Sequence, residues 1–285
     1  MGGYFHKAVQ EVPEELKEYF LGIVEDTTFG YNRYKSVEDR LVFPVLHVAR
    51  SPLKELEAIF VGEAIVLAFN NMMRTLGISI PGRHALVVGY GMIGKNVAKA
   101  LSANNIRASI YDTDYLRMIH AFMDGYPVIQ SLEEEISNFA LVISATGSPA
   151  ISYDLISKLK SGVILASAGS KNIEFDVKTL EEKAIAIEKL TDEVKIYSIK
   201  VADQEKEIVV LRDGTAINFR EKSVPSEIMD IVYTEILQCI LSLIDNWNKY
   251  TKGLYELTGR DQSRISKKWL QNLHKSQSPE NVPWV

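Results

Sequence analysis

The sequence predicts an α/β fold with a doubly wound parallel sheet, a short N-terminal segment before it and a C-terminal helical extension after it. From residue 84 onward, continuous apolar runs alternate with stretches of helical periodicity. This alternation is typical of parallel strands that are buried on both faces and joined by helical crossovers. The first apolar run also ends in three closely spaced glycines, Gly89, Gly91 and Gly94, which indicate a phosphate-binding turn.

Five apolar runs are expected to form strands: "HALVVG", "RASIYD", "PVI", "ALVISATG" and "GVILASAG". Four stretches between them are expected to form helices: "GKNVAKALSANN", "DYLRMIHAFMDG", "SLEEEISN" and "SYDLISKLK". Further along the chain, "KEIVVLRDGTAINF" predicts a β-hairpin that turns at Asp213 and Gly214.

Outside this region the patterns are mainly helical. Four stretches have helical patterns: residues 13–22, 52–73, 226–247 and 262–274. Ser51 is expected to cap the second helix. The stretch "GIVEDTTFGYNRYKS" is expected to be a loop or an irregular hairpin, and "RLVFPVLHVAR" a short strand that Pro44 interrupts at an edge or a bend. We therefore expect three segments: residues 1–80, 81–225 and 226–285.

The composition is typical of a soluble cytoplasmic protein. Hydrophobic residues make up 46% and charged residues 24% of the chain, and the net charge of −5 does not favour nucleic acid as a partner. No stretch approaches about 18 uninterrupted apolar residues, so we expect no membrane span. Cys239 lies in an apolar helical pattern, where we expect it to be buried, and a lone cysteine fits a reducing compartment.

The glycine turn predicts a dinucleotide site of the Rossmann type because its context is right: it follows an apolar strand and opens a helix. Gly89 permits the tight turn, Gly91 lets the backbone approach a pyrophosphate, and Gly94 lets the helix pack against the sheet. Met92 and Ile93 begin that helix, whose first N–H groups attract phosphate. The alternative is a strand–helix turn that uses its glycines only for packing.

Asp112 ends the next strand, 18 residues after Gly94. A carboxylate at this place accepts both ribose hydroxyls and repels a 2′-phosphate, so the predicted cofactor is NAD rather than NADP. Thr146 and Gly147 end the fourth expected strand and are predicted to contact the nicotinamide ribose with backbone and hydroxyl groups. Ser170, after the fifth strand, is a further candidate contact. For these last three residues the alternative is an ordinary turn.

Residues 82–218 resemble the NAD-binding domain of the S-adenosylhomocysteine hydrolase family. The motifs that carry the resemblance are "GYGMIGK", "IYDTDYLRMIHAFMDGY", "TGSPAI", "GSKNIEFDVKTL" and "GTAIN". Upstream, "GIVEDTTFGYNRYK" resembles the family's cofactor loop and "LVFPVLHVARSPLK" the segment that carries its catalytic lysine. With "VPSEIM" and the following helix, the resemblance covers about residues 22–247.

The resemblance implies an internal redox reaction, in which tightly held NAD⁺ takes a hydride from the 3′ carbon of the substrate ribose and returns it after elimination and water addition. It implies that Lys54 is the catalytic lysine and that Asp26 replaces a glutamate that binds substrate. It also implies that Thr27, Thr28 and Asn218 contact the cofactor, together with the glycine turn and Asp112.

Several family positions depart from the pattern. Ala58 and Ile59 replace an aspartate and an asparagine after the lysine, while Ser170 and Val224 replace two histidines. Most of the family's N-terminal substrate domain has no counterpart here, and neither does its C-terminal lysine–tyrosine arm. These departures are compatible with holding NAD and place the parent reaction in question.

Single residues outside the cofactor site have open alternatives. Lys54 is a candidate proton shuttle whose pKa partial burial lowers; the alternative is a solvated lysine in a first helical turn. Asp26 is a candidate for orienting a substrate hydroxyl; the alternative is a loop or cap aspartate. His47 is more typical of a structural histidine. No histidine, cysteine and carboxylate cluster has metal-ligand spacing, so no metal site is expected.

Three functions stay open at this point. The first is an NAD-dependent oxidoreductase for a small polar, nucleoside- or amino-acid-derived substrate. The second is a catalytically degenerate NAD-binding or regulatory partner protein, and the third is a hydrolase of the family's type that another chain completes. Because the expected helix over residues 226–247 is apolar, we also expect a homodimer or a higher homo-oligomer.

Overall fold

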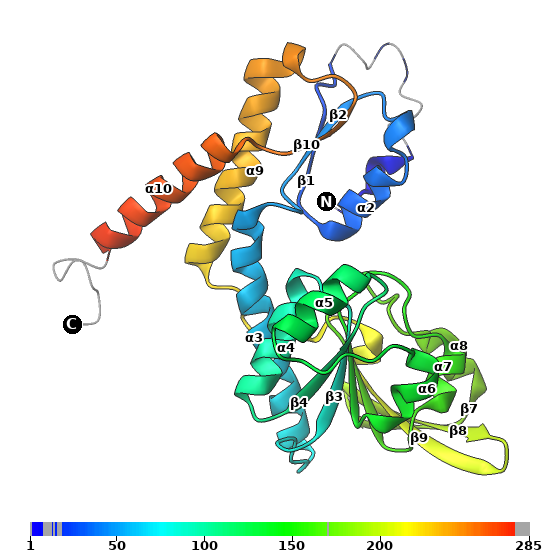
Figure 1. Ribbon diagram of the computed structural model, residues 1–285. Helices are drawn as coiled ribbons and strands as arrows, with labels where there is room; N and C mark the ends of the chain where they lie inside the picture. The colour runs from blue at the N-terminus through cyan, green and yellow to red at the C-terminus, as the bar shows by residue number, and fades with distance from the viewer. Residues whose placement is uncertain (1, 8–12, 14, 16–18, 170, 277–285) are drawn as a thin grey trace. The chain divides into compact units, whose positions relative to one another are not determined.

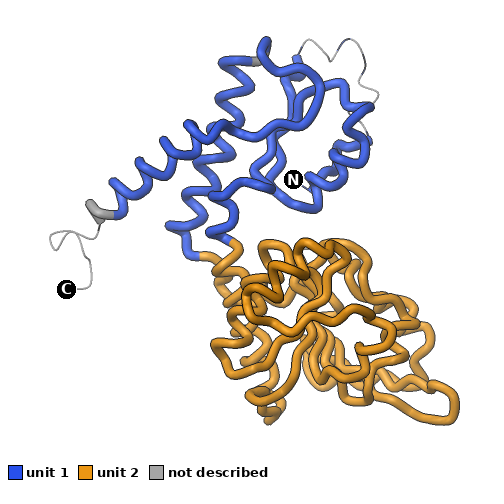
Figure 2. The backbone as a smooth tube through the Cα atoms, viewed as in Figure 1, with its two compact units in different colours: residues 1–57, 225–285 blue, residues 58–224 orange. Residues whose placement is uncertain are grey.

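The computed structural model describes residues 2–7, 13, 15, 19–169 and 171–276. The chain divides into two compact units, one formed by residues 58–224 and one formed by residues 1–57 together with 225–285 (Figure 2). The first and the last expected segments thus contribute to one unit, which the chain leaves and re-enters. Of the helix predicted over residues 13–22, residues 14 and 16–18 lie outside the described residues.

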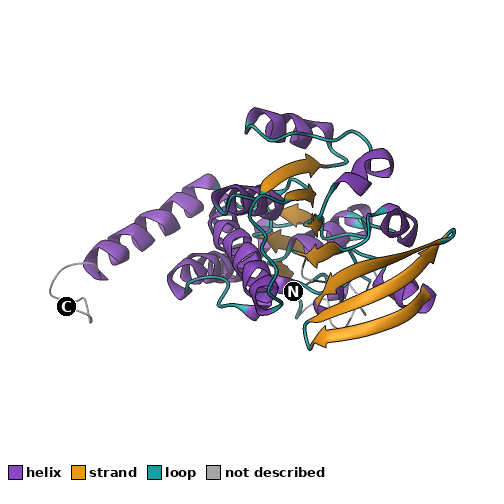
Figure 3. Ribbon diagram, turned by 90° about the horizontal axis from the view of Figure 1, so that it is seen from below, coloured by secondary structure: helices purple, strands orange, loops and turns teal. Residues whose placement is uncertain are grey.

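The larger unit contains a seven-stranded sheet in the order β4-β3-β5-β6-β9-β8-β7 (Figure 1). Its strands are β3 (His84–Val88), β4 (Arg107–Tyr111), β5 (Leu141–Ser144), β6 (Val163–Ser167), β7 (Ala184–Thr191), β8 (Val194–Val201) and β9 (Gln204–Leu211). The first five strands in this order are parallel, and β8 and β7 continue the sheet antiparallel. Figure 3 shows the three long strands β7–β9 at one end of the sheet. The doubly wound Rossmann prediction is confirmed.

Helices cover both faces of this sheet because its strands are apolar on both faces. They are α3 (Pro52–Thr75), α4 (Met92–Ala103), α5 (Tyr115–Met123), α6 (Leu132–Glu135), α7 (Tyr153–Lys158) and α8 (Val177–Lys183), with single turns at η4 (Ile136–Asn138), η5 (Arg212–Gly214) and η6 (Ile217–Arg220). Along β3, Ala85 and Val87 pack with α3 and α4, while Leu86 and Val88 pack with α7 and α8. Because successive side chains of a strand point to opposite faces of the sheet, alternate residues of β3 pack in two separate cores.

The smaller unit has its own parallel sheet, in the order β1-β2-β10. Its elements are β1 (Ile23–Glu25), β2 (Pro44–His47), β10 (Gly253–Tyr255), α2 (Thr28–Lys35), α9 (Ser226–Asn246) and α10 (Gly259–Ser276), with η1 (Tyr4–His6), η3 (Glu38–Arg40) and η7 (Trp247–Lys249). Leu46 of β2, Leu53 of α3 and Cys239 of α9 share its main core. Cys239 is fully buried, as predicted.

Four local predictions are wrong. The expected strand "PVI" is only an isolated bridge at Val128. The stretch after Gly22 is not a loop, because Thr27 caps α2 by accepting the N–H of Gly30 with its hydroxyl. Pro44 does not interrupt a strand; it begins β2, which is the central strand of its sheet. The turn at Asp213 is not a hairpin either, because β9 already pairs with β8 and the chain then enters η5.

Two helices are unusually apolar. By length and composition α3 could cross a membrane, but half of its apolar window is buried inside the protein, and core helices of soluble proteins pass the same test. On α9, Tyr233, Leu237 and Ile244 are more than half exposed. The predicted homo-oligomer would cover such side chains, and it stays a prediction.

The packing of α3 on α4 depends on Gly62. A Cβ added there would lie 2.6 Å from the backbone carbon of Asn96. Alanine normally stabilises a helix by about 1 kcal/mol relative to glycine. Overpacking costs about 1–3 kcal/mol, so we expect Gly62→Ala to lower the free energy of unfolding. Urea denaturation measures the change, with exposed Leu67→Ala on the same helix as control. A Gly62→Ala variant as stable as the parent would contradict this packing.

Candidate cofactor site and the Lys54 cluster

The glycine turn after β3 has the backbone that its sequence predicts. Gly89 has φ 95°, a left-handed conformation that favours glycine, and its N–H donates to the carbonyl of Tyr111 at 2.7 Å. A Cβ on Gly94 would lie 1.8 Å from the carbonyl oxygen of Gly89, so no larger residue fits there. Gly89 and Gly94 thus bring the start of α4 against the end of β3.

Gly91 leaves the start of α4 open. It is the N-cap of the helix, and having no side chain it makes no side-chain cap hydrogen bond. A Cβ there would meet only the guanidinium of Arg117, at 3.7 Å. The first N–H groups of a helix lack intrahelical partners, and Met92 and Ile93 are the first two residues of α4. These residues fit the diphosphate of a dinucleotide, which such helix starts bind.

Asp112 is buried at the end of β4 and faces the glycine turn. Its Oδ2 accepts the N–H of Tyr90 at 2.7 Å and its Oδ1 accepts the N–H of Asp114 at 2.9 Å. Each carboxylate oxygen has a second lone pair, so both can still accept a ribose hydroxyl. Arg117 lies 3.5 Å from Asp112 and 3.6 Å from Asp114. This guanidinium beside Asp112 was not predicted from the sequence.

The loop after β5 does not leave Thr146 and Gly147 free to contact a nicotinamide ribose as predicted. The N–H groups of Thr146 and Gly147 donate to Oε1 of Glu174 at 2.6 and 2.7 Å, and the Thr146 hydroxyl donates to the carbonyl of Ser148 at 2.8 Å. These donors are therefore occupied within the protein. Ser170, the third candidate at this end, lies outside the described residues.

Glu174 is the main residue that sequence reasoning missed at this site. Its side chain is fully buried, and its Oε2 accepts the Ser167 hydroxyl at 2.6 Å and the Gly169 N–H at 3.0 Å. A carboxylate within the apolar stretch "NIEFDV" was the available signal. Asn218, another cofactor candidate, is buried in η6 and donates to the Ser223 hydroxyl at 3.2 Å.

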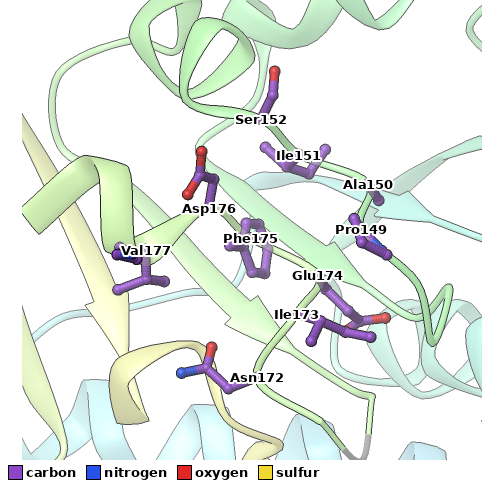
Figure 4. A pocket seen from close by; sticks show the side chains of 11 residues that line it. Pro149, Ala150, Ile151, Ser152, Asn172, Ile173, Glu174, Phe175, Asp176 and Val177 are labelled. Carbon is purple, nitrogen blue, oxygen red and sulfur yellow. The ribbon is translucent and has the colours of Figure 1, made fainter.

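A cavity of about 480 Å³ lies between residues 149–152 and residues 172–178 (Figure 4). The isolated bridge between Ile151 and Phe175 joins these two segments. None of the predicted cofactor residues lines this cavity. It therefore lies apart from the glycine turn, and we assign it no ligand.

Lys54 and Asp26, the two predicted catalytic residues, meet in the smaller unit. The Lys54 ammonium lies 2.6 Å from Oδ1 of Asp26 and also pairs with Glu57, one helical turn along α3. Burial lowers the pKa of Lys54, but the charges and hydrogen bonds of Asp26 and Glu57 outweigh it, so the pKa lies above its usual value. The expected lowering of the Lys54 pKa is thus wrong, because these two carboxylates lie against its ammonium.

Thr27 and Thr28 lie beside Asp26 at the start of α2. The Thr27 hydroxyl donates to Oε1 of Glu25 at 2.8 Å, and that buried carboxylate also accepts the N–H groups of Gly2 and Gly3. Burial raises the pKa of Glu25, but these hydrogen bonds together lower it below its usual value. Thr27 therefore has a structural role here, and the predicted cofactor role of both threonines stays a prediction.

His47 ends β2 and packs edge-on against Tyr31, with ring centroids 4.5 Å apart. Burial, with the nearby charge of Arg50, lowers the pKa of His47 to about 4, so it is neutral at physiological pH. In the same unit, the buried carboxylate of Glu235 accepts the Ser51 hydroxyl at 2.6 Å. Among the described residues, no group of three or more histidines, cysteines and carboxylates is arranged to hold a metal ion.

The contacts of Asp112 generate a prediction about cofactor choice. A hydrogen bond to a charged group contributes about 1.5–3 kcal/mol, so we expect Asp112→Ser to raise the dissociation constant for NAD⁺ at least about tenfold. Without the Asp112 carboxylate, Arg117 can attract the 2′-phosphate of NADP⁺. The preference of the site for NAD⁺ over NADP⁺ should therefore fall. Calorimetry with both dinucleotides measures this, with the exposed Asp154→Ser on α7 as control. Undiminished selectivity would remove Asp112 from the ribose site.

The family model for the S-adenosyl-L-homocysteine hydrolase NAD binding domain matches residues 64–223. The adenosylhomocysteinase of Thermotoga maritima is 29% identical over 94% of this chain and 65% of its own length. The adenosylhomocysteinase of Sulfurisphaera tokodaii is 30% identical over 93% of this chain and 63% of its own length. The chain thus spans less than two thirds of these relatives.

Similarity to solved structures is more remote. The A chain of dipicolinate synthase from Bacillus subtilis aligns with a TM-score of 0.44 and 13% identity, over 74% of this chain and 69% of that one. This level of similarity does not bear on function. The family model covers more than half of the chain, and the glycine turn, Asp112 and the start of α4 fit the dinucleotide that this domain binds. The chain belongs to the S-adenosyl-L-homocysteine hydrolase family, whose NAD-binding domain forms its larger unit.

Proposed function

We propose that this protein is an NAD-dependent oxidoreductase that acts on a small polar substrate derived from a nucleoside or an amino acid. The observation that carries the proposal is the half-buried ion pair between Lys54 and Asp26. A charged pair shielded from water is costly to build, and perturbed ionisable groups of this kind concentrate at functional sites. The same chain also has a cofactor site that fits NAD.

In this proposal Asp26 orients the substrate and Lys54 accepts its proton. Bound NAD⁺ supplies a hydride acceptor for a carbinol or amine carbon. Asp26 accepts a hydrogen bond from the substrate hydroxyl or amine and so orients the carbon. Lys54 takes the proton that the hydroxyl or amine loses as the hydride leaves. Because Asp26 and Glu57 keep Lys54 protonated, it must release its own proton first.

A second candidate is a non-catalytic NAD-binding partner protein. The raised pKa of Lys54 favours it, because a protonated lysine is a poor proton acceptor. The neighbouring side chains also favour it: buried Ala58 and exposed Ile59 follow Lys54 on α3 and offer no polar group. In this alternative the ion pair is only structural.

The reduced-nicotinamide absorbance band separates the two candidates. We expect the purified protein, mixed with NAD⁺ and a panel of adenosyl compounds and hydroxy acids, to produce this band with at least one compound. Lys54→Ala should reduce the rate at least about a hundredfold, in the range that general acid–base groups contribute. The strongly exposed Lys178→Ala should leave the rate unchanged. No band with any compound favours the binding protein, and an unchanged rate in Lys54→Ala removes Lys54 from the reaction.

The raised pKa also sets the pH dependence. Below its pKa, the neutral form of Lys54 increases tenfold with each pH unit, so we expect kcat/KM to rise with pH across the alkaline range. Glu57→Gln removes one of the two charges that raise the pKa, so the rise should move to lower pH. Exposed Glu55→Gln in the same helical turn is the control. A Glu57→Gln profile identical to the control would contradict the role of Lys54 as proton acceptor.

A further inference from the structure

One buried carboxylate joins the two loops that follow β5 and β6. Oε1 of Glu174 accepts the N–H groups of Thr146 and Gly147, and Oε2 accepts the Gly169 N–H and the Ser167 hydroxyl. The carbonyl of Glu174 also accepts the N–H of Ile151 at 2.9 Å. The side chain therefore links the two loops that follow these neighbouring parallel strands.

The fit around Glu174 is tight. A Cβ on Gly169 would lie 2.7 Å from the carboxyl carbon of Glu174, so glycine is required there. Figure 4 shows Glu174 among the residues of segment 172–178. Because the donors come from two loops, a shorter or neutral side chain at this position cannot satisfy both loops in their present positions.

The topology places these loops at the nicotinamide half of the cofactor site. In a doubly wound sheet, each mononucleotide half of the fold receives one half of the dinucleotide. Asp112 and the glycine turn belong to the β3–β4 half, where the adenosine ribose is recognised. The loops after β5 and β6 belong to the other half, at the same carboxyl edge of the sheet.

The charge of Glu174 is not neutralised by its donors, which are backbone N–H groups and hydroxyls. A buried charge acts over a longer distance than an exposed one because the interior screens it weakly. The nicotinamide ring is positively charged when oxidised and neutral when reduced. A buried negative charge in this half of the fold therefore favours the oxidised ring over the reduced ring.

We propose that Glu174 is a positioning residue for the nicotinamide half of the cofactor and that its charge makes the site prefer the oxidised form. The proposal concerns cofactor binding alone. It is therefore independent of the substrate and of the role of Lys54.

The test measures dissociation constants of the whole purified protein for NAD⁺, NADH and AMP. In Glu174→Gln, we expect NAD⁺ binding to weaken at least about tenfold more than NADH binding. In general, a unit charge that acts over about 10 Å in a medium of effective dielectric constant about 20 changes a binding constant by about this factor. AMP, which occupies only the adenosine half, should bind within about threefold of the parent.

Two further variants separate charge, position and stability. Glu174→Asp keeps the charge but shortens the side chain, so both dinucleotides should bind more weakly while the ratio of their constants stays native. Leu180→Ala, a fully buried change on α8 in the same unit, controls for lost stability and should leave all three constants within about twofold.

Three results would overturn the proposal. Two of them concern Glu174→Gln. One is an unchanged ratio of the dissociation constants for NAD⁺ and NADH, and the other is a loss of AMP affinity as large as the loss of NAD⁺ affinity. If Glu174→Gln does not fold, native affinity for both dinucleotides in Glu174→Asp would show that Glu174 does not position the cofactor.

Discussion

The cofactor site depends on one contact between two pieces of backbone. Gly94 lies so close to the carbonyl of Gly89 that a Cβ between them would be 1.8 Å from the oxygen. This approach brings the start of α4 against the end of β3, where the first N–H groups of the helix have no intrahelical partners. It also lets the N–H of Tyr90 reach Asp112, which joins the turn to β4. The glycines therefore determine the shape of the adenosine half before any side chain contributes.

The fold of the larger unit could be predicted from sequence because its strands are apolar on both faces. Runs such as residues 84–88 have this property whatever surrounds them, and β4, β5 and β6 were found in the same way. The smaller unit could not be predicted so well. Its three-residue strands carry too short a pattern, and α2 depends on the cap at Thr27. Tertiary pairing of β8 with β9 also overrode the turn signal at Asp213.

The candidate site residues also differ in how well the sequence predicted them. Gly89, Gly91, Gly94 and Asp112 were predictable because their functions follow from local spacing. Glu174 was not, because its donors at residues 146 and 147 precede it by more than 25 positions. The pKa of Lys54 was predicted with the wrong sign for the same reason. Burial was expected from sequence, but the approach of Asp26 from another element was not.

Two ways of stabilising buried charge occur in this chain. Lys54 is held by opposite charges, so its field is largely cancelled within a few ångströms. Glu174, like Glu25, is held by neutral dipoles, which satisfy its hydrogen bonds but leave its net charge. A paired charge acts more weakly beyond its partners, because the opposite charge opposes its field. An uncancelled buried charge acts through the low-dielectric interior, so Glu174 can bias a bound cofactor without contacting it.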